Sequence, residues 1–299
     1  MRKHPLAAAI GISLLVVAAF GLGVALLGPS QPGRAFFGGQ IGLVEIKGAI
    51  SDARPALAAL DEFRRDADVA AILLRVDSPG GAVGPSQEIY REVQRTAAAK
   101  PVVASLGTVA ASGGYYVAAA CTRIVASPGT ITGSVGVISS IPDLEGLLAK
   151  LGIRLQVIKS GEMKAAGTPE RPLNEAERAM LEAMTKDLYN QFLGDVIEAR
   201  KLTNDQIKAI ADSRILSGRQ AREAGLVDEL GNFNDALALA ARLGNLQGRP
   251  RLVEPEPKAG SFWRRFLRDE GRALLAELIG ELHASAAPRY LLSLPAREP

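Results

Sequence analysis

An almost continuous apolar run at residues 70–76, Ala-Ala-Ile-Leu-Leu-Arg-Val, places the strongest constraint on the fold. A strand that is apolar on both faces is typical of a sheet covered by helices on either side. The run ends in Asp-Ser-Pro-Gly-Gly at residues 77–81, a loop whose glycines allow the backbone to approach another group closely. We therefore expect a buried strand that leads into a loop of close backbone approach.

Strand and helix patterns alternate around this run. The strand-like segments are residues 41–46, 102–106 and 123–126. The helical segments are residues 55–65 and 86–99, and a further helix opens at Ser112. Such an alternation predicts an α/β fold with right-handed crossovers.

The second half of the domain is expected to be richer in helix. Asn174 and Glu177 have the spacing of a capping box, which predicts a long helix over residues 174–200. Its apolar stripe predicts packing rather than a cofactor site: Met180, Met184, Leu188, Phe192 and Val196. The other expected elements are a helix at 144–151, a strand at 155–158, a short strand and helix within 215–228 and a helix at 233–243.

Before the domain, Leu6 to Leu27 form a run of 22 residues without a charge. A helix of that length reaches about 33 Å, enough to cross a hydrocarbon core of about 30 Å. The run is longer than the apolar part of a signal peptide and lacks a convincing cleavage site, which favours an uncleaved anchor over a signal peptide. Arg2 and Lys3 would remain in the cytoplasm, so the rest of the chain would lie outside.

These features divide the chain into four parts. We expect a membrane anchor at residues 1–29, a linker at 30–39, a folded domain at 40–248 and a linker with a helical tail at 249–299. The tail contains an amphipathic helix at 261–283, with arginines beside an aromatic and leucine face. That helix could lie on an anionic membrane surface, form an oligomer contact or remain a solvated tail.

Composition narrows the chemistry. The single cysteine, Cys121, excludes an intrachain disulfide, and its alanine neighbours predict a buried structural thiol. One cysteine and two histidines leave almost no ligands for a metal site, so metal catalysis is not expected. A net charge of +3 does not indicate nucleic-acid binding.

Ser112 is the first candidate catalytic residue. It opens an apolar helix directly after a strand and a turn, where unpaired backbone N–H groups can polarise an oxygen. A nucleophile could use that position, and so could a helix-capping serine. The six residues 111–116, Ala-Ser-Gly-Gly-Tyr-Tyr, do not decide between the two by themselves.

A serine nucleophile needs a base, and the positions of the histidines indicate which kind. His4 precedes the domain and His283 lies in the tail, so lysine becomes the expected partner. Lys164 has small and apolar neighbours, whereas Lys159 resembles an ordinary exposed charge at a strand end. Ser134, in a glycine-flanked loop, could hold the lysine amine or merely bond its own turn.

Five segments in order strengthen this interpretation: residues 77–81, 111–116, 132–137, 159–164 and 225–228. Together they resemble the bacterial signal peptide peptidase A family, also called protease IV, over about residues 40 to 245. Each segment alone is weak, and their order makes the match specific. The chain resembles the short, single-unit form of the family.

The resemblance implies a ClpP/crotonase-like fold of repeated β-β-α/β-α units and a serine endopeptidase without a cofactor. By position, Ser112 matches the nucleophile, Lys164 the general base and Ser134 the serine that orients the lysine. The oxyanion hole would use amides of Gly113 and of the Gly80–Gly81 turn. Ala165 departs from the polar residue often found after the lysine.

The resemblance also implies partners and a location. Its members cleave remnant signal peptides and other membrane-associated peptides. They assemble into homo-oligomeric rings or domes, often with sites built from two protomers. The expected location is the bacterial inner membrane, with the catalytic domain on the periplasmic side. A crotonase-like acyl-CoA enzyme and a non-catalytic membrane scaffold of the same fold are the alternatives.

Overall fold

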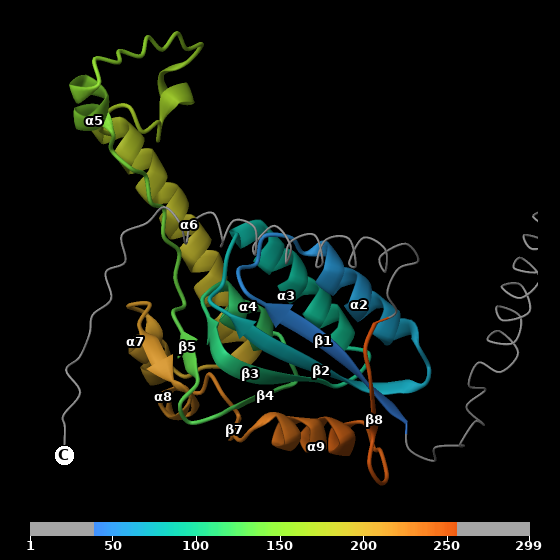
Figure 1. The fold of residues 1–299 in the computed structure, drawn as a ribbon. Coiled ribbons are helices and arrows are strands. Elements are labelled where there is room, and N and C mark those ends of the chain that lie inside the picture. Colours follow the sequence, from blue (N-terminus) through green and yellow to red (C-terminus); the bar gives the residue numbers. More distant parts are fainter. Residues whose placement is uncertain (1–38, 256–299) are drawn as a thin grey trace, which may run out of the picture.

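A computed structural model describes residues 39–255. Within that range, a sheet of eight strands is covered by helices on both faces (Figure 1). The predicted anchor, the amphipathic tail helix and most of the linkers beside them lie outside the described residues. Within residues 39–255, no helix combines the length and the apolar character needed to cross a membrane.

The sheet is mostly parallel, with the strand order β6-β5-β3-β2-β1-β8. Its strands on this path are β1 (Gln40–Lys47), β2 (Val69–Ser78), β3 (Val102–Ala111), β5 (Ile131–Gly133), β6 (Ile215–Ser217) and β8 (Arg251–Val253). Off the path, β4 (Arg123–Ala126) pairs with β3, and β7 (Glu229–Leu230) pairs with β4. Only the β5–β6 pair among these strands is antiparallel.

The strand predicted at residues 70–76 is the buried β2. Alternate side chains of the sheet enter two apolar clusters, so that Leu74 faces one layer of helices and Leu73 the other. The first layer contains α2 (Arg54–Arg65), α3 (Val83–Ala97) and α4 (Gly113–Ala119), and the second contains α9 (Phe233–Leu243) (Figure 1). The α/β prediction is therefore confirmed, and the arrangement is consistent with a ClpP/crotonase-like domain.

Helix α6 (Glu175–Arg200) begins where the sequence predicts. Asn174 Oδ1 accepts the Glu177 N–H at 2.8 Å, and Glu177 returns the bond as the capping-box partner. The C-terminal half packs on the core through Phe192 and Val196, which are buried. Met180 and Met184 are exposed, so the prediction of packing along the whole stripe is wrong for this end.

The exposed end of α6 belongs to an arm, which we define as residues 137–186. It contains α5 (Glu145–Lys150), the 3₁₀ helix η1 (Glu162–Ala165) and the first part of α6, and it projects away from the sheet (Figure 1). The strand predicted at residues 155–158 is absent. Leu155, Val157 and Ile158 are exposed there, and this segment has no neighbouring strand with which to pair.

Three smaller elements complete the fold. These are α7 (Asn204–Ile210), α8 (Gly218–Glu223) and the edge strand β8. The sequence predicts α8 but neither α7 nor β8. Strand β8 pairs with β1 in a segment that the sequence assigns to a linker, so the sheet extends to Val253. Cys121 is buried, as predicted.

Candidate active site

The candidate site lies where three neighbouring parallel strands end. Strand β3 has Ala111 paired with Gly133 of β5, and Ala110 paired with Ser78 of β2. The chain continues from these ends into Ser112, Ser134 and the Gly80–Gly81 turn. Because the carboxyl ends of adjacent parallel strands share one edge of a sheet, the three sequence segments meet there.

Ser112 occupies the position before α4 with a strained backbone. Its φ of 52° and ψ of −125° lie in a region that residues other than glycine rarely adopt. Its N–H donates to the Gly133 carbonyl at 2.9 Å, which fixes the sharp corner between β3 and α4. The side chain makes no capping hydrogen bond, so the structure does not support the alternative of a helix-capping serine. The half-buried hydroxyl is free to face the pocket.

The Gly80–Gly81 turn packs directly beneath Ser112. A Cβ atom added at Gly80, whose φ is 100°, would lie 2.7 Å from Gly113 N and 3.0 Å from Ser112 Cβ. Buried Ser78 holds the turn, because its Oγ accepts the Gly80 N–H at 3.1 Å. The Gly80 amide is therefore engaged, and its role in the geometry is to permit close approach.

Two backbone N–H groups remain beside Ser112. The hydrogen bonds around Gly81 involve its neighbours, with Ile50 N–H donating to Gly80 O and Ala82 N–H donating to Ile50 O. Within residues 39–255, neither Gly81 N–H nor Gly113 N–H has an acceptor. A Cβ atom built at Gly113 would lie 3.3 Å from Gly81 N, so the two glycines are adjacent. Two such donors can bind one oxyanion.

Ser134 follows β5 in the same way that Ser112 follows β3. Its φ is also 52°, and its N–H donates to Arg214 O at 2.9 Å. Ser134 and Ser112 line a common pocket of about 340 Å³. The structure therefore brings together four of the six predicted site residues as pocket lining (Ser112, Ser134, Gly81 and Gly113), with Gly80 in contact beneath.

Part of the pocket wall is aromatic and apolar. Tyr116 packs against Phe192 with ring centroids 4.3 Å apart, and its hydroxyl donates to the Asp195 carboxylate. Burial raises the pKa of Tyr116, and the hydrogen bond to Asp195 raises it further, so the phenol stays neutral. Leu188 completes this wall. Such a wall suits an uncharged substrate side chain.

Sequence reasoning missed several lining residues. Ser86 on α3 is buried, donates to Ala82 O at 2.9 Å and lies against Gly113. Ser213, with φ of 61°, donates to Val135 O at 2.8 Å and supports the loop after Ser134. Neither serine lies in one of the five matching segments, so no sequence signal identified them. Ser78 does lie in a matching segment, residues 77–81. Its position two residues before Gly80 could have indicated that it supports the glycine turn.

Lys164 lies on η1 in the arm, and its side chain is exposed. Within the described residues its amine has no hydrogen-bond or ion-pair partner. Lys159 differs, because its Nζ donates to Glu162 O at 2.7 Å and lies 3.4 Å from the Glu162 carboxylate. The structure thus leaves Lys164, and not Lys159, with a free amine.

Lys164 and Ser112 are not neighbours in one chain. Residues just after Lys164 are joined to Glu177 at the first turn of α6, whereas α4 contacts α6 at Phe192 and Asp195. The rise of a helix separates Glu177 from Phe192 by about 22 Å along the axis. Figure 1 shows the same separation between the arm and α4.

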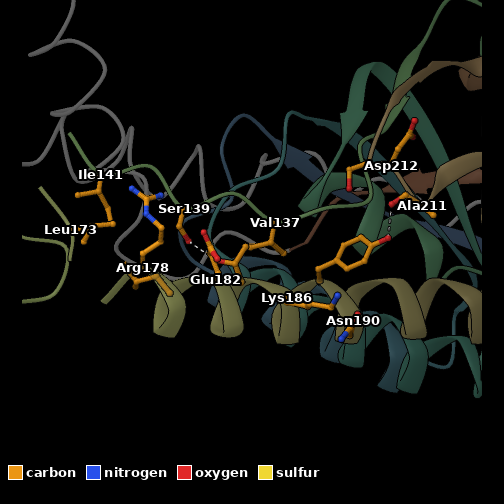
Figure 2. Close-up of a pocket in the computed structure, with 14 residues that line it drawn as sticks. Val137, Ser139, Ile141, Leu173, Arg178, Glu182, Lys186, Asn190, Ala211 and Asp212 are labelled. Atoms are coloured by element: carbon orange, nitrogen blue, oxygen red, sulfur yellow. Dashed lines mark hydrogen bonds between the residues drawn. The ribbon is translucent and has the colours of Figure 1, made fainter. Parts of the chain in front are cut away.

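A groove of about 610 Å³ runs from the pocket along α6 into the arm. Val137 and Ser213 line both hollows, so the groove continues from the site of Ser112. In Figure 2 the α6 side chains Arg178 and Glu182 point toward the segment that carries Ser139 and Ile141, and Lys186 lines the same groove. Hydrogen bonds join the two walls of the groove at two points. Ser139 and Thr185 hydroxyl oxygens lie 3.1 Å apart, and the Tyr189 hydroxyl donates to Ala211 O at 2.7 Å.

Comparison with known proteins agrees with the family that the five segments resemble. Residues 94–247 match the model of Peptidase family S49. A Synechocystis protein named "Putative protease" is 43% identical over 208 residues, covering 69% of this chain and 75% of that protein. "Protease 4" of Salmonella typhi is 35% identical over 253 residues, covering 81% of this chain and 41% of its own length.

A further relative carries the name that the sequence resemblance indicated. "Putative signal peptide peptidase SppA" of Enterococcus faecium is 37% identical over 182 residues, covering 60% of this chain and 53% of that protein. The family match extends over half of the chain and includes Ser112, Ser134 and Lys164. The resemblance to signal peptide peptidase A is therefore confirmed, and the chain belongs to the serine peptidases of family S49.

Proposed function

We propose that the chain hydrolyses peptides with Ser112 as nucleophile and Lys164 as general base. The observation that carries this proposal is the free Ser112 hydroxyl, on a strained corner beside the unpaired N–H groups of Gly81 and Gly113. Strain of about 1–3 kcal/mol at such a residue persists when the surrounding structure requires its geometry. A nucleophile beside two oxyanion donors is one arrangement that requires it.

The reaction proceeds through an acyl-enzyme. Neutral Lys164 Nζ accepts the proton of Ser112 Oγ as this oxygen attacks the scissile carbonyl carbon. Gly81 and Gly113 N–H groups bind the oxyanion, and the lysine then protonates the leaving amine as the peptide C–N bond breaks. Lys164 next takes a proton from water, whose oxygen attacks the ester, and returns a proton to Ser112.

The base comes from a second copy of the chain. This part of the proposal rests on the separation of Lys164 from Ser112 within one protomer and on the free amine of Lys164. It also rests on the surface of the arm. Most of the large apolar side chains that residues 39–255 expose lie there, including Leu151, Leu155 and Ile158. Such a surface is typical of a contact between proteins.

In the complete site, Ser134 holds the incoming lysine amine. Its hydroxyl lies in the Ser112 pocket, and no hydrogen bond to it is formed within residues 39–255. An ammonium or amine entering the pocket would meet this hydroxyl beside Ser112. The predicted role of Ser134 is thus retained as part of the proposal.

The proposed substrates are remnant signal peptides and other membrane-associated peptides. The apolar wall of Tyr116, Phe192 and Leu188 suits their uncharged side chains, and the groove along α6 could hold flanking residues. The name of the Enterococcus relative and the uncharged run Leu6 to Leu27 support the same class. We place the domain on the outer side of the bacterial inner membrane, in a homo-oligomeric ring or dome.

Peptide cleavage by three single variants tests the dyad. Ser112→Ala and Lys164→Ala should each lower kcat by at least about 10⁴-fold, because members of a catalytic unit act together. Lys159→Ala is the matched control and should retain most activity. Lys164→Ala with near wild-type turnover, in protein that elutes at the wild-type size, would overturn the assignment of the base.

A further inference from the structure

The arm contains two buried residues, and hydrogen bonds from Arg171 link them beside Lys164. Between residues 137 and 186, only the side chains of Ala165 and Glu177 are buried, and Glu177 is 0% exposed. Ala165 directly follows Lys164 in the chain. A buried carboxylate in an otherwise exposed arm needs a partner, because an unpaired buried charge is strongly unfavourable.

Arg171 supplies that partner through a two-pronged contact. Its guanidinium donates to Glu177 Oε1 at 2.5 Å and to Glu177 Oε2 at 2.8 Å. The same guanidinium donates to the Ala165 carbonyl at 3.3 Å, and Thr168 Oγ1 donates to that carbonyl at 3.1 Å. The planar fork of arginine therefore joins Glu177 to the peptide unit that follows Lys164.

Glu177 also fixes the start of α6. Its Oε2 accepts the Asn174 N–H at 3.2 Å, and its own N–H donates to Asn174 Oδ1. The hydrogen bonds from Arg171 hold the pKa of Glu177 at about 2, so the carboxyl remains ionised under assay conditions. One carboxylate thus connects the rigid helix, Arg171 and η1.

We propose that Glu177 and Arg171 are positioning residues that hold Lys164 in the geometry for proton transfer, acting through the carbonyl of Ala165. The inference rests on the proposed function, because it requires Lys164 to be the base. Lys164 lies on a four-residue 3₁₀ helix with an exposed side chain, so its own packing fixes it little. The clamp formed by Ala165, Arg171 and Glu177 fixes its backbone relative to α6.

The first experiment compares two clamp variants with a surface control. Glu177→Gln removes the charge that Arg171 binds. It keeps the capping box, because glutamine also serves as the capping-box partner at this position. We expect kcat to fall about 10- to 100-fold with KM within twofold, because a misplaced base slows proton transfer. Arg171→Lys keeps the positive charge but cannot form the two-pronged contact, and its kcat should fall by a similar factor.

The control is Arg54→Met. Arg54 makes a comparable fork with Asp52 at 2.7–3.0 Å on the surface, and neither residue lines the pocket or the groove. This variant should retain wild-type kcat and KM. All variants should keep the wild-type oligomer size, and a lower melting temperature in the two clamp variants would reflect the loss of the buried pair rather than a change in Lys164 itself. Loss of assembly in Glu177→Gln would assign the clamp to the interface and overturn a positioning role.

The second experiment asks whether Glu177 acts through Lys164. Hydrolysis of an activated peptide ester is measured for Lys164→Ala, for Glu177→Gln and for the double variant. A positioning role predicts that the double variant is no slower than Lys164→Ala alone, because the base that Glu177 positions is already absent. If the two single-variant losses in rate multiply in the double variant, Glu177 does not act through Lys164 and the positioning role is contradicted.

The two proposals fail in distinguishable ways. If Lys164→Ala retains full activity, the Ser-Lys assignment fails and the clamp loses its purpose. If Lys164→Ala is inactive and Glu177→Gln has wild-type kcat, the dyad stands and the positioning inference is overturned.

Discussion

The body, which we define as residues 39–136 and 187–255, carries Ser112, and the arm carries Lys164. These two regions place their functional residues by opposite means. Ser112 follows a buried strand, and Gly80, Gly113 and Ser78 are packed around it with little free space. Lys164 lies in a segment where Ala165 and Glu177 are the buried residues and a few hydrogen bonds replace a core. The body can hold a strained corner by packing, whereas the arm depends on polar contacts and on whatever surface it meets.

The first test of this contrast replaces a glycine near each functional residue. Gly80→Ala places a Cβ atom 2.7 Å from Gly113 N at a φ of 100°, so Ser112 must move. We expect activity to fall at least about 100-fold and the free energy of unfolding to fall by about 1–3 kcal/mol. Peptide hydrolysis and chemical denaturation measure both effects.

Gly161→Ala is the counterpart in the arm. Gly161 precedes Lys164 by three residues, has an extended φ of −160° and has no atom within 4 Å of an added Cβ. Activity should remain near wild type, and the free energy of unfolding should change by less than about 0.5 kcal/mol. If Gly161→Ala is as damaging as Gly80→Ala, the arm is packed more tightly than this contrast allows.

The second test is the pH dependence of kcat/KM. A base must be neutral to accept the proton of Ser112, so the proposed mechanism predicts that kcat/KM rises with pH. Burial raises the pKa of Tyr115, Tyr116 and Cys121, so these groups remain neutral across that rise. A flat profile between pH 6 and 10 would contradict an amine as the general base.

The Arg171–Glu177 pair does not contribute to that profile. Hydrogen bonds from Arg171 lower the pKa of Glu177 from 4.5 to about 2. Because the folded value is the lower one, the stabilisation by this pair is fully present above about pH 4.5 and is lost as the pH falls toward 2. Loss of activity between pH 6 and 8 therefore reports on the dyad and not on this clamp.

The third test separates stability from assembly. Ile158 on the arm is 99% exposed, so Ile158→Lys should change the free energy of unfolding by less than about 0.5 kcal/mol. Activity should nevertheless fall, by about tenfold, if the arm meets a second copy through its apolar side chains. Gel filtration and peptide cleavage measure the two effects.

The matched change in the body is Leu74→Ala. Leu74 is fully buried, and the variant should lose about 2–5 kcal/mol of stability. An Ile158→Lys protein with wild-type size and activity would show that this part of the arm is not a contact surface.

The sequence predicts the body better than the arm for the same physical reason. Apolar periodicity reports burial, and the predicted elements at residues 41–46, 55–65 and 233–243 agree with β1, α2 and α9. In the arm, apolar residues are exposed in the single chain, so a strand was predicted at 155–158 where none forms. Periodicity cannot distinguish a core from a surface that meets another protein.

The candidate site divides in the same way. Ser112, Ser134 and the glycines follow strand ends that neighbouring strands bring together, so their proximity follows from an α/β sheet. The place of Lys164 depends on the direction in which α6 projects, which local patterns do not determine. Glu177 was predicted as the capping-box partner of Asn174. Its link to Ala165 through Arg171 was not predicted, because that link joins a loop to the helix.

Mixing two inactive variants tests the central claim most directly. Ser112→Ala chains retain Lys164, and Lys164→Ala chains retain Ser112. If each site joins the two residues from neighbouring copies, equal mixing with subunit exchange should restore about a quarter of wild-type activity, since both intact residues meet at one site in four. Restored peptide cleavage is the result predicted. Confirmed mixed oligomers without any activity would contradict a dyad shared between two copies.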